Sequence, residues 1–151
     1  MTDDQAFDVE YGYWYNAACE RFYRRVDFVC NFVQLVGGSA AAAAAWGGSG
    51  GLVVASGLLL ACAAAISLTV QPAVKAERHE RTKCAHLAIK RRRHQADEAA
   101  VHEAITDAQA GGPVGLGALA MPAYNDAVRA MGREQGVRPL RWWERVAAFI
   151  A

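Results

Sequence analysis

The most constraining feature of this sequence is a stretch without charge that runs from Phe28 to Gln71, in a chain in which 21% of all residues are charged. A helix that crosses a bilayer needs about 20 mostly apolar residues to cover about 30 Å of hydrocarbon. The stretch is long enough for two such helices, and the segment 46–51, Trp-Gly-Gly-Ser-Gly-Gly, stands near its middle. We therefore predict an all-α protein with a transmembrane helical hairpin, whose helices run near 26–46 and 52–71.

The rest of the chain divides around this hairpin. Residues 1–25 form an amphipathic N-terminal segment, 26–71 the hairpin, 72–110 a long charged helix, and 111–151 a Gly/Pro loop followed by C-terminal amphipathic helices. Pro72 marks the end of the second crossing, and 73–110 lacks both Gly and Pro, which predicts one long helix, with a break and fold-back as the alternative. The alternative is a soluble helical bundle, because the alanines at 40–45 add little transfer free energy to the first crossing.

Charge around the crossings predicts their orientation. Arginines at 21, 24 and 25 precede the first crossing, and Lys75, Arg78, Arg81 and Lys83 follow the second, whereas the turn between them has no charge. Cytoplasmic loops carry an excess of Lys and Arg. Both termini are therefore expected in the cytoplasm. The acidic N-terminus lacks the basic region of a cleavable signal peptide, so the first crossing is expected to serve as its own insertion signal.

Small residues recur at every fourth position in both crossings. This spacing lets two helix backbones approach closely, which is how membrane helices associate where lipid offers no hydrophobic driving force. The predicted packing seam consists of Gly37, Gly38, Ala41, Ala42, Gly57, Ala61 and Ala65. The pattern is compatible with tight packing inside the hairpin, with oligomer packing, or with both, and we expect a homo-oligomer.

Two amides, Asn31 and Gln34, stand in the first crossing, three residues apart. Polar groups at membrane depth bond a neighbouring helix or line a wet path. The pair is therefore predicted either to join helices or to line a pore.

Aromatic and basic residues mark the predicted membrane interfaces. Tyr and Trp favour the headgroup level, where one side of the ring is apolar and the other wet. The residues assigned to the interface are Trp14, Tyr23, Arg24, Arg25, Trp46, Trp142 and Trp143. The alternative for the N-terminal aromatic stripe is packing against the 73–110 helix. The final helix, from Pro139 onward, has a broad apolar face with basic flanks, and it is expected either to lie in the interface or to dock on that same helix.

The sequence gives little indication of nucleic-acid binding, metal binding or catalysis. The basic run 90–94 reads as a solvated helix face, so nucleic acid is not expected as a partner, and the four histidines at 79, 86, 94 and 102 read as surface residues. The four cysteines match neither a zinc pattern nor a CxxC motif. The chain has no phosphate loop, HExxH or GxSxG motif. We expect no enzyme, no metal and no cofactor.

The plan of the chain resembles the SLATT domains, small two-helix membrane proteins of bacterial conflict systems and mobile elements. The features that carry the resemblance are the segment 15–21 before the first crossing, the hairpin at 26–71, and Ala123-Tyr124-Asn125 in the tail. The resemblance implies an oligomeric effector in the bacterial inner membrane that opens a pore and depolarises the cell. The alanine-rich first crossing and the lack of an attached sensor domain depart from it.

Two further classes share these features. A phage-type holin or exclusion factor also has a hairpin, a short loop and a charged tail. A non-conducting scaffold or adaptor would use the lipid bilayer as its anchor and recruit a cytoplasmic protein through the 73–110 helix.

Overall fold

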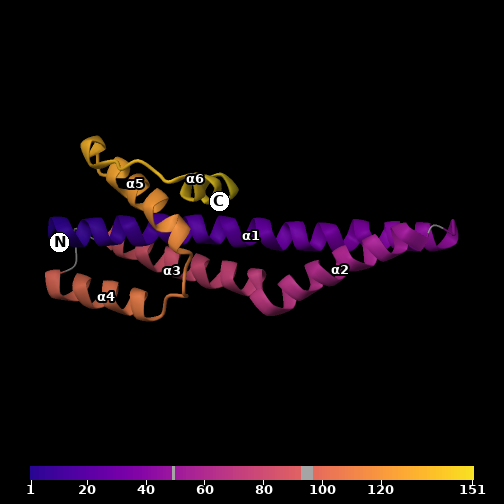
Figure 1. Ribbon diagram of the computed structural model, residues 1–151. Helices are drawn as coiled ribbons and strands as arrows, with labels where there is room; N and C mark the ends of the chain where they lie inside the picture. Colours follow the sequence, from indigo (N-terminus) through magenta and orange to yellow (C-terminus); the bar gives the residue numbers. More distant parts are fainter. Residues whose placement is uncertain (49, 93–96) are drawn as a thin grey trace. The chain divides into compact units, whose positions relative to one another are not determined.

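The structure, a computed structural model, describes residues 1–48, 50–92 and 97–151, and these residues contain helices and no strand (Figure 1). The all-α prediction is confirmed. The α-helices are α1 (Asp3–Trp46), α2 (Gly50–Val70), α3 (Pro72–Arg92), α4 (Glu98–Ala110), α5 (Ala120–Ala130) and α6 (Trp142–Ile150). Two short 3₁₀ helices, η1 (Gly117–Leu119) and η2 (Glu134–Gly136), flank α5.

The chain forms two compact units. The first, here called the bundle, comprises Met1–Phe22 and Lys75–Ala151, and the second, the apolar unit, comprises Tyr23–Val74. Helix α1 contributes residues to both. Its start is a capping box, in which Gln5 N donates to Thr2 Oγ1 (3.2 Å) and Thr2 N donates to Gln5 Oε1 (3.0 Å). These bonds satisfy backbone donors that the first helical turn leaves open.

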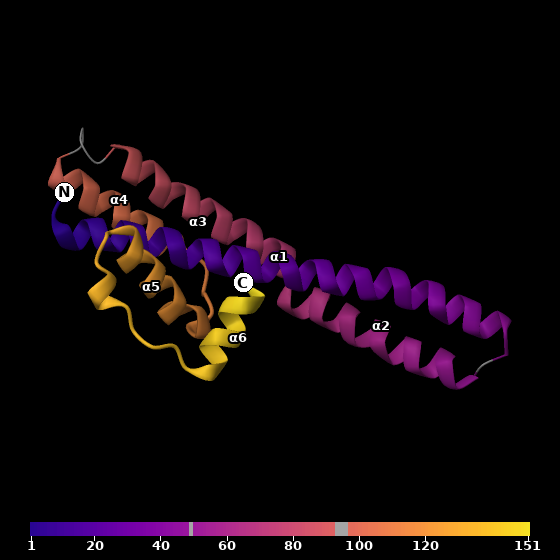
Figure 2. The same ribbon diagram turned by 90° about the horizontal axis from the view of Figure 1, so that it is seen from above.

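In the apolar unit, α1 and α2 run side by side and antiparallel (Figures 1 and 2). Helix α1 ends at Trp46, followed by Gly48 in the left-handed region with φ 73°, a conformation that glycine adopts without steric cost. Helix α2 ends at Val70, and Gln71 has φ 50°. Pro72 disfavours helical geometry at the residue before it and starts α3 instead. The two helices therefore end close to the predicted positions.

In the bundle, residues 72–110 contain two helices instead of one long helix, so the alternative of a break with a fold-back applies. Helix α3 ends at Arg92, and Asp97 has an extended backbone (φ −63°, ψ 154°) with its carboxylate accepting from Glu98 N at the start of α4. Asp is a favoured N-cap residue, and it begins a new helix here. Residues 93–96, which include the end of the predicted basic run, lie outside the described part of the chain.

The reason for the break is hydrophobic burial. Helix α4 folds back so that Val101 and Ile105 join Ile89 of α3 and Val9 of α1 in one buried cluster. A straight helix would leave these side chains in water, at a cost of about 1.5–3 kcal/mol for each large one. Sequence periodicity within 73–110 did not reveal this cluster, because Val9 belongs to a distant segment.

The C-terminal part of the bundle packs against α1 in a second buried cluster. Ala18 and Cys19 of α1 pack with Leu119 and Ala151, and Ala147 of α6 lies against them. The predicted short helix 122–132 and final helix from 139 correspond to α5 and α6. The buried Asn125 of α5 fixes the connection before α6, because its amide both donates to Arg138 O (2.8 Å) and accepts from Arg138 N (2.9 Å).

Candidate functional site

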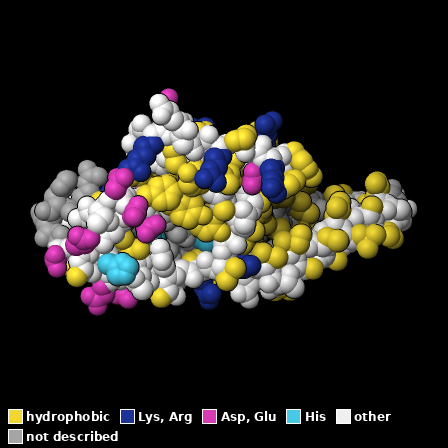
Figure 3. Space-filling view, turned by 60° about the vertical axis from the view of Figure 1, so that its left-hand side comes forward, with side chains coloured by type: hydrophobic (Ala, Val, Ile, Leu, Met, Phe, Trp, Pro, Cys, Tyr) yellow, Lys and Arg dark blue, Asp and Glu magenta, His cyan; other side chains and the backbone are white. Residues whose placement is uncertain are grey.

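The apolar helices are exposed instead of buried. Among the described residues, two helices, Asp3–Trp46 and Gly50–Arg92, contain windows long and apolar enough to cross a membrane, with mean hydropathies of 1.5 and 2.3. Only 6% of each window is buried within the chain. Figure 3 shows hydrophobic side chains over the part formed by α1 and α2. A core helix of a soluble protein would be mostly buried, so this surface requires lipid or another apolar cover.

The contact between α1 and α2 involves only part of the predicted seam. A Cβ atom on Gly37 would lie 3.2 Å from Leu60 Cδ2, so this glycine allows the close approach of the two helices. Ala41 is half-buried on the same face, and Ala44 and Ala63 are buried. Small residues at these positions therefore do serve the hairpin.

The other seam residues face away from the hairpin contact. Gly57, Ala61, Ala65 and Ala42 are exposed, and a Cβ atom on Gly38 or Gly57 would meet nothing within 4 Å. Of the two alternatives for the seam, packing inside the hairpin does not apply to these five positions, and their packing between copies stays a prediction. The reason is the rotation of α2, which turns Leu60 and Ser67 toward α1.

The two amides of the predicted first crossing, Asn31 and Gln34, have different partners. Gln34 Nε2 donates to Ser67 Oγ (3.2 Å) across the hairpin, whereas Asn31 Nδ2 donates to Asp27 Oδ2 (3.0 Å) within α1 and is exposed. The interhelix role holds for Gln34 alone. Asn31 is exposed and Asp27 half-buried, so this polar pair lies where the apolar part of α1 begins.

The predicted interface residues fall into two groups. Trp46, Trp142 and Trp143 are 96%, 72% and 41% exposed, and Arg24 and Arg25 are also exposed. Tyr23 is buried and Trp14 is half-buried. These last two side chains therefore pack within the protein.

The N-terminal aromatic stripe packs inside the bundle. The rings of Phe7, Tyr11 and Tyr15 stack in succession along α1, with centroids 6.1 and 5.7 Å apart. Phe7 also meets the ring of Tyr124 edge-on at 5.5 Å. The alternative of protein packing therefore applies to this stripe, although its partner is α5 and not the predicted long helix.

Two histidines of α3 are buried against α1, which contradicts their assignment to the surface. His79 and His86 are 0% and 1% exposed. His79 Nδ1 is 2.8 Å from Asn16 Oδ1, and the same amide donates to Gly12 O at 2.8 Å. The ring of His86 lies directly against Gly12, where a Cβ atom would be only 2.3 Å from Cε1. Positions seven residues apart share a helix face, and this spacing was the available signal for burial.

Ion pairs flank these histidines along the same α1–α3 interface. Lys83 pairs with Glu20, and Lys90 pairs with Glu10. Both glutamate side chains are only 9% exposed. The lysines are more exposed, at 22% for Lys83 and 38% for Lys90, so both pairs lie at the edge of the contact. The interface between α1 and α3 therefore combines buried polar side chains with ion pairs at its edge.

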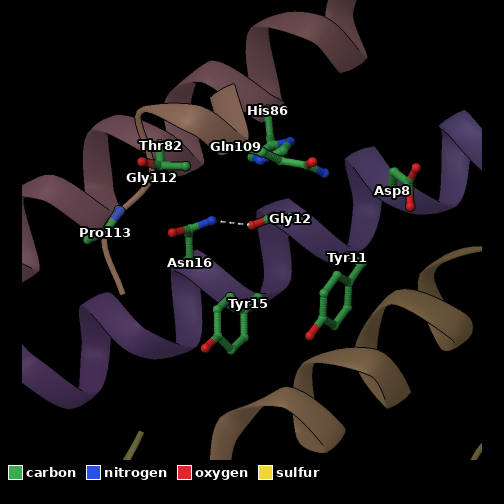
Figure 4. A pocket seen from close by; sticks show the side chains of 10 residues that line it. All are labelled: Asp8, Tyr11, Gly12, Tyr15, Asn16, Thr82, His86, Gln109, Gly112 and Pro113. Atoms are coloured by element: carbon green, nitrogen blue, oxygen red, sulfur yellow. Dashed lines mark hydrogen bonds between the residues drawn. The ribbon is translucent and has the colours of Figure 1, made fainter. Parts of the chain in front are cut away.

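A cavity of about 240 Å³ lies beside His86 (Figure 4). Asn16 and Gly12 of α1, Thr82 and His86 of α3, and the segment around Gly112 line it. Figure 4 shows His86 and Gln109 together on one side of α1, with the rings of Tyr11 and Tyr15 directed to the other. The Nδ1 atom of His86 is buried without a hydrogen-bond partner in the described part of the chain. Burial of the ring disfavours its protonated form, and Asp8, which also lines the cavity, opposes this effect.

The histidines make the bundle sensitive to acid. Desolvation lowers the pKa of His79 and of His86 below the ordinary 6.5. For His79, Glu20 of α1 opposes this shift and Lys75 adds to it, and for His86 the opposing charge is Asp8 of α1. A group with a lowered pKa stays neutral when folded but binds a proton when unfolded. The stability it confers is complete above pH 6.5 and is lost as the pH falls below that value.

We expect the melting temperature of the bundle to fall between pH 7 and pH 5. Each histidine contributes up to about 1.4 kcal/mol per pH unit in the window between its unfolded and folded pKa. Thermal unfolding of the full chain in detergent at a series of pH values measures this slope. His79→Gln with His86→Gln should flatten it, and the exposed His102→Gln should leave it unchanged. An unaltered slope in the double variant would refute the assignment.

Among the described residues, no group of three or more His, Cys, Asp and Glu side chains is arranged to hold a metal ion. Comparison of the chain with protein families, with curated proteins and with solved structures finds no match.

Proposed function

We propose that this chain is a small integral membrane protein whose helices α1 and α2 cross the bilayer as a hairpin. The observation that carries the proposal is the contrast between composition and burial: both helices are strongly apolar, yet 6% of each apolar window is buried within the chain. Lipid is the solvent that removes such a surface from water, and helices satisfy their own backbone hydrogen bonds within it. The basic residues at both ends of the hairpin support termini in the cytoplasm of a bacterial cell.

The same proposal includes self-association and permeabilisation of the membrane. The small residues that face away from the hairpin contact, Gly38, Ala42, Gly57, Ala61 and Ala65, support close packing between copies. Asn31, exposed and bonded to Asp27, supports a polar path along α1 in such an assembly. The function is that of a membrane-depolarising effector. Loss of membrane potential on expression is its direct test.

Labelling of single cysteines tests the hairpin and its orientation. The exposed Cys62 and Cys84 are replaced by alanine, and the buried Cys19 and Cys30 are kept. In this background, Gly51→Cys should react with an impermeant thiol reagent in intact spheroplasts, because it is exposed at the start of α2, beside the outer turn. Thr2→Cys should react only after lysis.

The background protein without an added cysteine serves as the control and should remain unlabelled. The protein should also stay with the membrane after alkaline extraction. Recovery in the soluble fraction, or reaction of Thr2→Cys in intact spheroplasts, would contradict the hairpin or its orientation.

A further inference from the structure

Helix α6 has two apolar faces with different surroundings. One face packs on the bundle through Ala147, and the chain end beside it is fixed by a 2.7 Å bond from Arg21 Nε to Ala151 O. The other face consists of Trp142, Val146 and Phe149, which are 72%, 51% and 86% exposed. Their spacing of four and three residues places them on one side of the helix. These three side chains keep half or more of their surface exposed.

The exposed face has basic side chains around it. Arg141 lies over the ring of Trp143, 5.1 Å from its centroid, and Arg145 is exposed one turn later, with its Nε donating to Leu140 O at 3.2 Å. The one acid of the helix, Glu144, accepts a bond from Arg141 N at 2.7 Å and so serves the helix start. Figure 3 shows Lys and Arg side chains beside hydrophobic ones in the bundle. A short apolar face with tryptophans and arginines matches the interface of an anionic membrane.

The attachment point of α6 also favours the membrane as its partner. Ala151 is bonded to Arg21, and Arg21 belongs to α1, the helix that contains the first apolar window. Arg24 and Arg25 follow it in the sequence and are exposed. Under the proposed hairpin, the membrane boundary begins at about Val26. The end of α6 is thus tied to the part of α1 that precedes the boundary.

We propose that α6 is an interfacial helix that inserts Trp142, Val146 and Phe149 between the headgroups of anionic phospholipids. The arginines at 141 and 145 bind the lipid phosphates, and the apolar side chains reach the start of the acyl region. The inference rests on the proposed membrane insertion. It assigns a second membrane contact to this protein, outside the two crossings.

Spin labels at single cysteines measure this contact in the full chain. The label is placed at Phe149→Cys in the Cys62→Ala, Cys84→Ala background, and the protein is reconstituted in vesicles of phosphatidylcholine with or without 30% phosphatidylglycerol. Relative accessibility to oxygen and to a water-soluble nickel complex reports the depth of the label. We expect lipid depth in the anionic vesicles and a smaller docked fraction in the neutral ones. Ala130→Cys, on the exposed end of α5, should stay in water in both.

The charge requirement is tested by Arg141→Gln with Arg145→Gln in the same labelled protein. Removal of one basic residue near an anionic surface should lower the ratio of docked to undocked label about five-fold, and removal of both about 25-fold. Arg81→Gln, an exposed residue on α3, removes a positive charge elsewhere and should have no effect.

Two results would overturn the proposal. One is a label at 149 that stays accessible to the nickel complex in anionic vesicles. The other is a label immobilised by protein, with coupling between labels that disappears on dilution with unlabelled chains, which would identify a second copy as the partner. Resistance to alkaline extraction is measured on the same vesicles. If the protein is inserted but α6 is in water, only the α6 proposal fails.

Discussion

Replacing Gly12 with valine is expected to lower the free energy of unfolding of the bundle by about 2–3 kcal/mol. Any Cβ atom at this position would lie 2.3 Å from Cε1 of the buried His86 ring, so α1 and α3 must separate. Overpacking of a dense interior costs about 1–3 kcal/mol, and it exceeds the gain of about half a kcal/mol or less from replacing glycine by valine in a helix. Separation would also strain the pairs Glu20–Lys83 and Glu10–Lys90.

Thermal unfolding of the full chain in detergent, followed by near-ultraviolet circular dichroism, measures this loss. The aromatic stripe of Phe7, Tyr11 and Tyr15 lies in the bundle and reports on its packing. Gly117→Val is the matched control, since a Cβ atom there meets nothing within 4 Å. Combining Gly12→Val with His86→Ala should cost less than the sum of the two single changes, because the second removes the obstructing ring. Simple additivity would show that the contact is not the cause.

Induced expression of the protein is expected to collapse the membrane potential and stop growth, and Asn31→Leu is expected to abolish both effects. Ions left without solvation in hydrocarbon are too costly, so a conducting path needs polar groups. Asn31 is an exposed amide in the first crossing, whereas Gln34 is engaged with Ser67. The leucine should therefore remove the polar path and leave the hairpin intact.

A potential-sensitive dye, read in cells with matched protein levels, measures the effect. Ser39→Leu is the control, because Ser39 is exposed on the same helix but bonds the carbonyl of Leu35 at 3.0 Å. It should depolarise as the parent chain does. Gln34→Leu should instead weaken the hairpin and lower the amount of inserted protein. Depolarisation that Asn31→Leu leaves untouched would remove Asn31 from the path.

Other results would favour the other two classes. Sudden lysis at a fixed time, dependent on a co-expressed muralytic enzyme, would indicate a holin. Stable expression without a change in potential would indicate a scaffold, with recruitment of a cytoplasmic protein as its activity. Its recruiting surface would then be sought on α3 and α4 in their folded-back arrangement, since a single extended 73–110 helix is not formed.

The extent and the ends of the apolar helices were predictable from sequence. Charge is absent from 28 to 71, the glycines after Trp46 stop α1, and Pro72 stops α2. These are local effects of composition and backbone geometry. The docking of the aromatic stripe onto α5 and the burial of His79 and His86 were not predicted, because each depends on segments more than 60 residues apart in the chain.

The sequence by itself determined that the chain is helical and where its apolar helices end. Only the tertiary structure decided which faces meet: Gln34 with Ser67, His86 with Gly12, and Ala147 with the second buried cluster. The physical reason is that a helix end is set by a few neighbouring residues, whereas the rotation of a helix is set by the sum of contacts with its partners. The fold-back at Asp97 shows the difference, since the capping residue is local but the buried cluster that favours the break includes Val9 of α1.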